Sequence, residues 1–328
     1  MEENKMPVTN IGSRWNRSGY EGALDFYRKD TGASVMTVSE GGIVADVNPS
    51  GGKDYYVCGN SGDDTNDGLS WATAYQTLAT ALAASHANIA AGSTGWAARN
   101  RIFCKGDDFV EDLVALAQKT DIIGVGSSDN YPMPCIRGNH APVNNAMGCR
   151  FFNVRFRPAA SDDLVTLDST SGGSIEFHGC IFDAHYEAFT APSAIDMTAA
   201  QYVKIMGCDF LGAFSGDVID IGAGSINGLR IIGNNILGGA DNGIVATGTM
   251  TCVQGRNGLV ADNYIQVADK IIDDGADGVL YSFNNVGVSG EAAGANAYVV
   301  TAGYGANNIF TCNGVTASVP SCNYGAQT

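Results

Sequence analysis

Three aspartates recur at matching places in short apolar runs, and they are the residues of this chain best suited to acid–base chemistry. Asp196, Asp220 and Asp273 lie in the stretches AIDM, VIDI and IIDD. The Ile and Met residues beside them are predicted to face a core, so the aspartates are predicted to face outward. Asp196 and Asp220 would then lie on neighbouring strands, where repulsion between like charges raises one pKa.

This aspartate column has three interpretations. Glycosidases need two carboxylates about 5 to 9 Å apart, and Asp196 and Asp220 could form such a pair, with Asp273 further along. Asp196 and Asp220 could instead bind a carbohydrate or a cation. Because the chain has 34 Asp and Glu residues, neighbouring carboxylates also arise by chance, and a solvated surface needs no functional explanation.

Two cysteines in a shared frame raise the question of metal or redox chemistry. Cys180 and Cys208 both occur as Gly-Cys-x-Phe, in SIEFHGCIFDA and YVKIMGCDFLGA. The chain has 9 cysteines and no CxxC pair, so their spacing does not predict a zinc site. Reduced thiols are expected because no export signal is evident, although Cys312 and Cys322 could form a disulfide under oxidising conditions.

The frame around both cysteines repeats along the chain. Six segments share it, at intervals of 27, 28, 26, 29 and 21 residues: FFNVRF, EFHGCIF, KIMGCDF, RIIGNNI, LVADNYI and YSFNNVG. A second apolar run lies within the units, as in LVTLD, AIDMT, VIDIG, GIVAT and KIIDD. Short strands at this period, separated by Gly, Asn, Ser and Asp turns, are typical of a parallel β-helix.

The repeated Asn or Cys position is predicted to be structural. The alignment places one column at six positions: Asn153, Cys180, Cys208, Asn234, Asn263 and Asn284. An asparagine there can hydrogen-bond the turn of the next coil and so form a ladder. A cysteine there can pack as a small apolar residue, with Phe182 and Phe210 behind it. We therefore expect stacked, reduced thiols rather than a redox or metal centre.

Alternation within the strands predicts which side chains are buried. Inward-facing positions are expected at Ile175, Phe177, Val203, Ile205, Leu229 and Ile231. Between them, Glu176, Lys204 and Arg230 are expected to face solvent in one column, on coils about 4.8 Å apart. Exposed ion pairs contribute about 0–1 kcal/mol each, so an acid–base ladder explains this column without a catalytic role.

The segment before the coils is predicted to form a capping helix. Trp71, Tyr75, Leu78 and Leu82 follow helical spacing, and Thr73 with Gln76 fits a capping box. Such a helix would cover strand edges at the open end of the stack.

From this segment onward the sequence resembles a known superfamily. YVCGNSGDDTNDGLSWATAYQTLATAL, followed by IFCKGDDFVEDL and DIIGVGS, resembles the opening of right-handed parallel β-helix proteins of the pectate-lyase-like superfamily. The resemblance runs from about residue 53 to about residue 310. The superfamily includes pectin esterases, polysaccharide lyases and virion proteins of tailed phages, so it implies a fold more than an activity.

The first 52 residues differ from the coils. ALDFY, RKDTG and ASVMTV predict a hairpin that turns at Asp-Thr-Gly. The module is similar to short N-terminal segments that fix phage β-helices to a particle; an ordinary hairpin packed on the first coil is the alternative. We therefore expect an all-β chain: an attachment-like hairpin and linker (1–52), a cap region with the helix (53–100), and a right-handed single-stranded parallel β-helix with a C-terminal tail (101–328).

None of the enzyme signatures of the superfamily is complete in this chain. GCDFLGAFSGDVIDIG has the general shape of a pectin esterase site but lacks the Gln-Asp-Thr turn and the arginine. Of the polygalacturonase motifs only Gly106-Asp107-Asp108 occurs, without its partners. Arg230 is a lone candidate for the arginine base of a pectate lyase, and the acid–base ladder explains it equally.

Composition limits the partners that the chain can have. A net charge of -16 repels phosphate backbones and anionic lipids, so neither a nucleic acid nor a membrane is expected as a partner. Neither a signal peptide nor a membrane-spanning run is evident. The acidic loop around Asp63 and Asp67 lacks the closing glutamate of an EF-hand. Neither a metal nor a cofactor is expected.

Together these features favour a virion structural protein of a tailed phage, without enzymatic activity. It would attach through its N-terminal segment and project its β-helix as a capsid decoration, fibre or tail-associated protein. By the resemblance it would be a homotrimer, assembled in the host cytoplasm with other capsid or tail proteins, with a host surface glycan as a further partner. The alternative is a glycan-degrading or glycan-binding tailspike or polysaccharide lyase.

Overall fold

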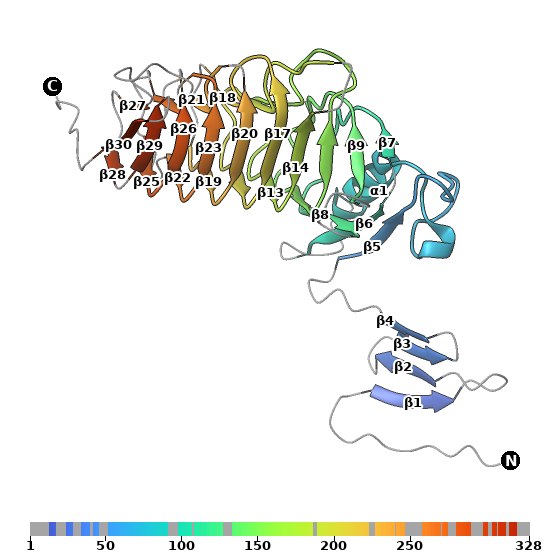
Figure 1. Cartoon of the computed structure of the whole chain (residues 1–328). Helices are drawn as coiled ribbons and strands as arrows, with labels where there is room; N and C mark the ends of the chain where they lie inside the picture. Colours follow the sequence, from blue (N-terminus) through green and yellow to red (C-terminus); the bar gives the residue numbers. More distant parts are fainter. Residues whose placement is uncertain are drawn as a thin grey trace, which may run out of the picture. The chain divides into compact units, whose positions relative to one another are not determined.

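The chain divides into two compact units, residues 1–51 and 52–328, in the computed structural model (Figure 1). In the first unit the structure describes four strands. In the second it describes residues 52–90, 98–106, 108–126, 133–185, 189–222, 227–239, 241–246, 258–269, 271–274, 280–289, 298–300, 304–306, 308–312 and 315–319.

The first unit contains an antiparallel sheet, sheet A, in which each strand pairs with the next along the chain. Its strands are β1 (Ser13–Arg17), β2 (Leu24–Arg28), β3 (Ser34–Ser39) and β4 (Gly42–Ala45). The predicted hairpin corresponds to β2 and β3, in which Leu24 lies opposite Val38. Whether this unit attaches the chain to a particle stays a prediction.

The second unit is a parallel β-helix with three sheets. Sheet B has ten strands: β5 (Asp54–Val57), β6 (Asn100–Lys105), β8 (Thr120–Val125), β10 (Arg150–Phe152), β13 (Glu176–His178), β16 (Lys204–Met206), β19 (Arg230–Ile232), β22 (Gly258–Ala261), β25 (Leu280–Phe283) and β28 (Tyr304–Ala306). Sheet C also has ten: β7 (Asp108–Val110), β9 (Cys135–Arg137), β11 (Arg155–Arg157), β14 (Ile181–Ala184), β17 (Asp209–Phe214), β20 (Asn235–Gly239), β23 (Tyr264–Val267), β26 (Val286–Ser289), β29 (Asn308–Cys312) and β30 (Val315–Val319). Sheet D has six: β12 (Val165–Leu167), β15 (Ile195–Met197), β18 (Ile219–Ile221), β21 (Ile244–Ala246), β24 (Ile272–Asp274) and β27 (Tyr298–Val300).

From β10 to β27 each coil adds one strand to each sheet, and Figure 1 shows strands such as β13 and β14 following one another along the stack. The strands pair in parallel, so Glu176 lies beside Lys204, and Lys204 lies beside Arg230. The last pair of sheet C, β29 with β30, is antiparallel. The predicted parallel β-helix is therefore confirmed.

The interior is filled by the residues that the alternation predicted. All six positions predicted to face inward are at most 1% exposed: Ile175, Phe177, Val203, Ile205, Leu229 and Ile231. Phenylalanines on successive strands of sheet C stack face to face, with Phe182 between Phe156 and Phe210. Sheet strands with apolar side chains at alternate positions thus build one continuous core.

The helix of the second unit begins later than the spacing predicted. In the described part of the chain, α1 spans Leu78–Ala90, and no described helix is long and apolar enough to cross a bilayer. Trp71 lies in a 3₁₀ turn, η1 (Trp71–Thr73), whose N-cap is Ser70. Tyr75 forms a β-bridge with Val57. The predicted start of the helix at Trp71 and its capping box at Thr73 are therefore wrong.

Side chains distant in sequence hold the N-terminus of α1. The Glu111 carboxylate accepts hydrogen bonds from the backbone N–H groups of Leu78 and Ala79, both at 2.8 Å. A carboxylate there also complements the helix dipole. The helix contacts β5 and β6, and its role as a cap stays a prediction. Local spacing could not predict this start because the stabilising carboxylate lies 33 residues away from Leu78.

His140 is a buried histidine beside a small cavity in the core. Its Nδ1 accepts a hydrogen bond from Leu113 N at 3.1 Å, so the neutral ring carries its proton on Nε2. Nε2 has no hydrogen-bond partner among the described residues, and the ring borders an apolar cavity of about 10 Å³. Burial lowers the pKa of His140 to about 4, although the charge of Asp112 opposes this.

The stability of the fold is expected to fall with acid through His140. The pKa of His140 in the folded state is below its unfolded value of about 6.5. Between these two pKa values the unfolded state binds a proton that the folded state does not bind. The stabilisation is complete above pH of about 6.5 and is lost as the pH falls toward 4. Urea unfolding at several pH values should show His140→Asn losing less stability over this range than the parent, by up to about 3 kcal/mol. His185→Asn, at an exposed position, is the control and should follow the parent; equal acid sensitivity of all three proteins would contradict the assignment.

Candidate functional site

Sheet D carries the predicted aspartate column on its outer face. Thr166, Asp196 and Asp220 are aligned on β12, β15 and β18. Each lies between two buried residues of its strand and is itself partly exposed. Asp196 and Asp220 therefore lie directly beside each other on neighbouring coils, as the sequence predicted.

Asp273 lies further along the same column. Val245 on β21 stands between Asp220 and Asp273 in the register. The side chain of Asp273 lies outside the described residues. The described pair is therefore Asp196 with Asp220.

Burial and neighbouring carboxylates perturb both members of the pair. Burial raises the pKa of Asp196, and the charge of Asp163 adds to it. Burial, followed by the charges of Asp196, Asp217 and Asp163, raises the pKa of Asp220 to about 6. Oδ1 of Asp220 is shielded from solvent and has no hydrogen-bond partner among the described residues.

Two further aspartates in this cluster were missed from the sequence. Asp163 Oδ1 accepts a hydrogen bond from Ser193 N at 2.9 Å. Asp217 Oδ1 accepts from Asn242 N at 3.1 Å and from its Nδ2 at 2.7 Å. The two aspartates and their two partners occupy the same place in their coils. Each lies two positions before a residue of sheet D: Asp163 before Val165, Ser193 before Ile195, Asp217 before Ile219 and Asn242 before Ile244. A polar residue at this fixed offset is the signal that could have identified them.

The two aspartates differ in their environment in a way that acid–base chemistry can use. The pKa of Asp220, raised to about 6, lies closer to neutral pH than that of an ordinary aspartate, and Asp196 lies directly beside it. Among the described residues, no group of three or more His, Cys, Asp and Glu is placed to hold a metal ion. The arrangement can therefore exchange a proton or accept hydrogen bonds from hydroxyl groups.

Replacing Asp220 by asparagine is expected to stabilise the fold at neutral pH. Because the folded pKa of Asp220 is above its unfolded value, stability is lost as the pH rises from about 4 through about 6. A shift of this size corresponds to about 3 kcal/mol, which we discount to about 1 kcal/mol because the residue is partly exposed and solvent screens its charge. Asp220→Asn should therefore raise the free energy of unfolding by about 1 kcal/mol at pH 8 and leave it unchanged at pH 4.

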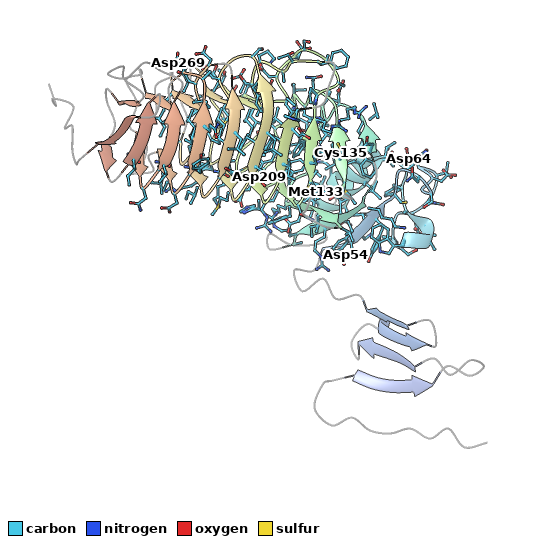
Figure 2. The ribbon with its side chains drawn as sticks, in the orientation of Figure 1. Asp54, Asp64, Met133, Cys135, Asp209 and Asp269 are labelled. Atoms are coloured by element: carbon cyan, nitrogen blue, oxygen red, sulfur yellow. The ribbon has the colours of Figure 1, made fainter. Side chains whose placement is uncertain are left out.

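Asp209 provides the matched control for this measurement. It faces outward on β17 of sheet C (Figure 2), away from the aspartate column. Asp209→Asn makes the same change in net charge and should alter the stability by less than about 0.5 kcal/mol at either pH. If Asp220→Asn lowered the free energy of unfolding at pH 8, the ionised Asp220 carboxylate would not destabilise the folded state, and the prediction would be wrong.

An asparagine ladder runs inside the stack, where each coil passes from sheet B to sheet C. Asn234, Asn263, Asn285 and Asn308 form it, each at most 2% exposed. Oδ1 of Asn263 accepts hydrogen bonds from N and Nδ2 of Asn234, both at 2.9 Å. Oδ1 of Asn285 accepts in the same way from Asn263, and Oδ1 of Asn308 from Asn285. Each asparagine thus satisfies the turn of the preceding coil.

Cys180 and Cys208 occupy the same column. Both are buried free thiols. Cys208 N donates to Asn234 Oδ1 at 2.8 Å, and its thiol donates to Phe177 O at 3.5 Å. Burial raises the pKa of the Cys208 thiol, and a buried protonated thiol is a poor nucleophile. Their position therefore agrees with a packing role; the side chain of Cys312 and all of Cys322 lie outside the described residues.

Asn153 and Asn284 lie one residue before the ladder position, although Asn153 Nδ2 also donates a hydrogen bond to the preceding coil, at Gly124 O (3.0 Å). Their φ angles are +55° and +53°, and they fill a turn position that is taken by glycine in other coils, such as Gly207. The residue aligned with the ladder follows one position later, at Val154 and Asn285. The predicted column was displaced by one residue at these two coils because asparagine is favoured both in left-handed turns and in hydrogen-bond ladders.

Polar side chains on the outer face of sheet B interact between coils and within a strand. Lys204 Nζ lies 2.8 Å from Glu176 Oε1 of the preceding coil. His178 Nε2, on the same strand as Glu176, lies 2.8 Å from Glu176 Oε2. Arg230 continues the row beside Lys204, and its Nη1 donates to Leu229 O at 2.9 Å. The Glu176–Lys204 pair of the predicted acid–base ladder is present, and Arg230 continues the column next to another cation.

The acidic loop before the helix uses its carboxylates to hold its own shape. Asp64 Oδ1 accepts from Gln76 N at 2.9 Å. Asp67 Oδ1 accepts from Leu69 N at 3.0 Å and from Thr73 Oγ1 at 2.6 Å. The hydrogen bond from Thr73 lowers the pKa of Asp67. These bonds give the loop a structural function.

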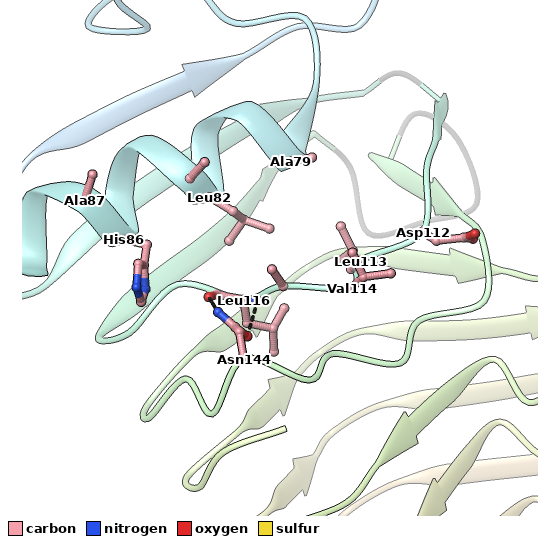
Figure 3. Close-up of a pocket in the computed structure, with 11 residues that line it drawn as sticks. Ala79, Leu82, His86, Ala87, Asp112, Leu113, Val114, Leu116 and Asn144 are labelled. Carbon is pink, nitrogen blue, oxygen red and sulfur yellow. Dashed lines mark hydrogen bonds between the residues drawn. The ribbon is translucent and has the colours of Figure 1, made fainter. Parts of the chain in front are cut away.

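A groove of about 280 Å³ lies between α1 and the residues that follow β7 (Figure 3). Its walls are mostly apolar, with Leu82 on the helix facing Leu113 and Leu116. His86 also lines it, and its Nδ1 has no hydrogen-bond partner among the described residues. Asn144 is engaged with the backbone of Leu116 in both directions. The described residues that line the groove bring no nucleophile or carboxylate pair to the imidazole.

No family model, curated protein or solved structure is significantly similar to this chain.

Proposed function

We propose that the chain is a structural protein of a tailed-phage virion, without enzymatic activity. In this proposal the N-terminal unit attaches to the particle, and the β-helix projects as a capsid decoration, fibre or tail-associated protein. The partners are other capsid or tail proteins, and the protein assembles in the host cytoplasm. By the resemblance to the pectate-lyase-like superfamily, it forms a homotrimer.

One observation carries this proposal. Polar side chains bond neighbouring coils to one another: Glu176 pairs with Lys204, and Asn263 bonds Asn234 and Asn285. Bonds of this kind stiffen a stack of coils, and a stiff shaft is what a projecting virion protein needs. The separate antiparallel unit at residues 1–51 is suited to attachment by its compactness.

The location of the protein in particles tests the proposal directly. Gold-labelled antibodies against the β-helix should mark purified virions at a fixed site on the capsid or the tail. A chain that lacks residues 1–51 should be absent from such particles, provided that its circular dichroism still shows the β-helix. Virions without the protein would overturn the proposal, and incorporation of the shortened chain would overturn attachment through residues 1–51.

A second candidate function is binding or cleavage of a surface glycan. It is favoured by the Asp196–Asp220 pair, in which the pKa of Asp220 is about 6. Incubation with host surface polysaccharides should then release reducing ends or unsaturated sugars. Asp196→Asn should abolish this release, whereas Asp209→Asn should not. Product release that survives Asp196→Asn would exclude this pair as the catalytic site.

A further inference from the structure

The outer face of sheet B carries a stripe of apolar residues that one histidine interrupts. One residue from each of six successive strands forms it, and each is partly exposed: Phe103, Ile123, Phe152, His178, Met206 and Ile232. Tyr56 extends the stripe at the β5 end, next to Phe103. Side chains that face outward from a sheet are usually polar, so this stripe requires an explanation.

The ring faces of the aromatic residues in the stripe are already occupied. The rings of Phe152 and His178 stack with centroids 4.9 Å apart and planes 12° apart. Tyr56 and Phe103 stack with centroids 5.5 Å apart and planes 26° apart. The Arg150 guanidinium also lies over the Phe152 ring, at 5.4 Å from its centroid. A sugar ring or a nucleobase that stacks on an aromatic residue needs a free ring face. This stripe offers mainly ring edges, which suit contact with a flat protein surface.

A row of charges that alternate in sign from Asp54 to Lys204, and end with a second cation at Arg230, runs beside the stripe. Its members come from seven strands of sheet B, starting at Asp54 (labelled in Figure 2): Asp54, Arg101, Asp121, Arg150, Glu176, Lys204 and Arg230. Arg101 pairs with Asp54 at 2.6 Å, Arg150 with Asp121 at 2.7 Å, and Lys204 with Glu176 at 2.8 Å. Charges that are already paired lose less hydration energy on burial than isolated charges. The row can therefore be covered together with the stripe.

The charge of this face favours a second copy of the chain as its partner. Four cations and three anions give the row a net charge of +1, whereas the whole chain has a net charge of -16. On sheet D, by contrast, Asp163, Asp196, Asp217 and Asp220 gather. Two copies of so acidic a chain repel each other across most surfaces, but not across the outer face of sheet B. Alternating charges are also self-complementary, because a shift by one coil places cations opposite anions.

We propose that copies of this chain associate with one another through the outer face of sheet B. The aromatic residues, methionine and paired arginines of the face are the types that interface centres favour. Seven strands about 4.8 Å apart and a width of about 15 Å give roughly 500 Å² per copy, which is at the low end for specific interfaces. The association is therefore weak and reversible, with a dissociation constant in the micromolar range. This inference extends the homo-oligomer part of the proposed function and does not depend on a particle.

Sedimentation velocity of the full chain from about 1 to about 100 µM tests the proposal. The sedimentation coefficient should rise with concentration, and the rise should persist in 0.5 M NaCl because the contact is mainly apolar. The double variant Met206→Lys, Ile232→Lys should remain monomeric over the same range, with unchanged circular dichroism. Tyr264→Lys places a lysine at a 40% exposed outward position of sheet C and should associate like the parent.

Three outcomes would overturn the proposal. A parent chain that is monomeric at every concentration excludes self-association. Loss of association in Tyr264→Lys, with association kept in the double variant, moves the contact to sheet C. A monomeric parent that binds a host polysaccharide through Met206 and Ile232 makes the face a glycan surface. Absence of the protein from virions would overturn the proposed function but would not change the sedimentation result. The proposed function and the proposed self-association can therefore be rejected independently.

Discussion

Replacing Asn263 by alanine is expected to lower the free energy of unfolding by about 3 to 4 kcal/mol. Oδ1 of Asn263 accepts two hydrogen bonds from Asn234, and its Nδ2 donates to Ile231 O at 3.0 Å and to Asn285 Oδ1 at 2.9 Å. Alanine leaves the backbone N–H of Asn234, a residue that is 2% exposed, without its acceptor. The side-chain amide of Asn234 loses one of its two acceptors and keeps Ile205 O. A buried polar group without a partner costs about 1 to 3 kcal/mol. Urea unfolding, followed by circular dichroism, measures the loss.

Asn284→Gly is the matched control for this experiment. Asn284 is exposed and has a φ of +53°, a conformation that glycine adopts freely. Its replacement should change the stability by less than about 1 kcal/mol, as expected of a turn position that glycine fills in other coils. If Asn284→Gly were as damaging as Asn263→Ala, the ladder would have to include Asn284 after all.

Phe182→Ala is expected to destabilise the β-helix by about 4 kcal/mol. Phe182 is fully buried, and its ring stacks on Phe156 at 5.1 Å and on Phe210 at 4.7 Å between centroids. It also meets the edge or face of Phe177, at 5.4 Å and 70°. Alanine removes all three ring contacts and leaves a cavity that the surrounding strands, fixed by their ladders, cannot close.

The effect of Phe182→Ala is measured by the urea midpoint and is compared with Phe189→Ala. Phe189 is 41% exposed, so its truncation should cost less than about 1 kcal/mol. Because each coil contacts only its neighbours, the loss should first open the coils around β14 in hydrogen exchange. A loss below about 1 kcal/mol for Phe182→Ala would refute a tightly packed phenylalanine stack.

The sequence by itself determined the class of the fold. The period of the frame around Cys180 and Cys208 predicted stacked coils, because every coil must repeat the same in–out alternation to share one core. The same alternation placed Ile205 inside and Lys204 outside, and it placed Asp196 beside Asp220. These features follow from local patterns that repeat.

Only the tertiary structure decided features that depend on residues far apart in the chain. The start of α1 is held by Glu111, and the pKa of Asp220 depends on burial and on the charges of Asp196, Asp217 and Asp163, which the fold brings together from different coils. The ladder position at Asn285 rather than Asn284 also required the register between coils. A helix start, a pKa and a register are each set by contacts between coils. Because the coils differ in length, the sequence separation of two contacting residues varies, and the sequence alone does not predict which residues meet.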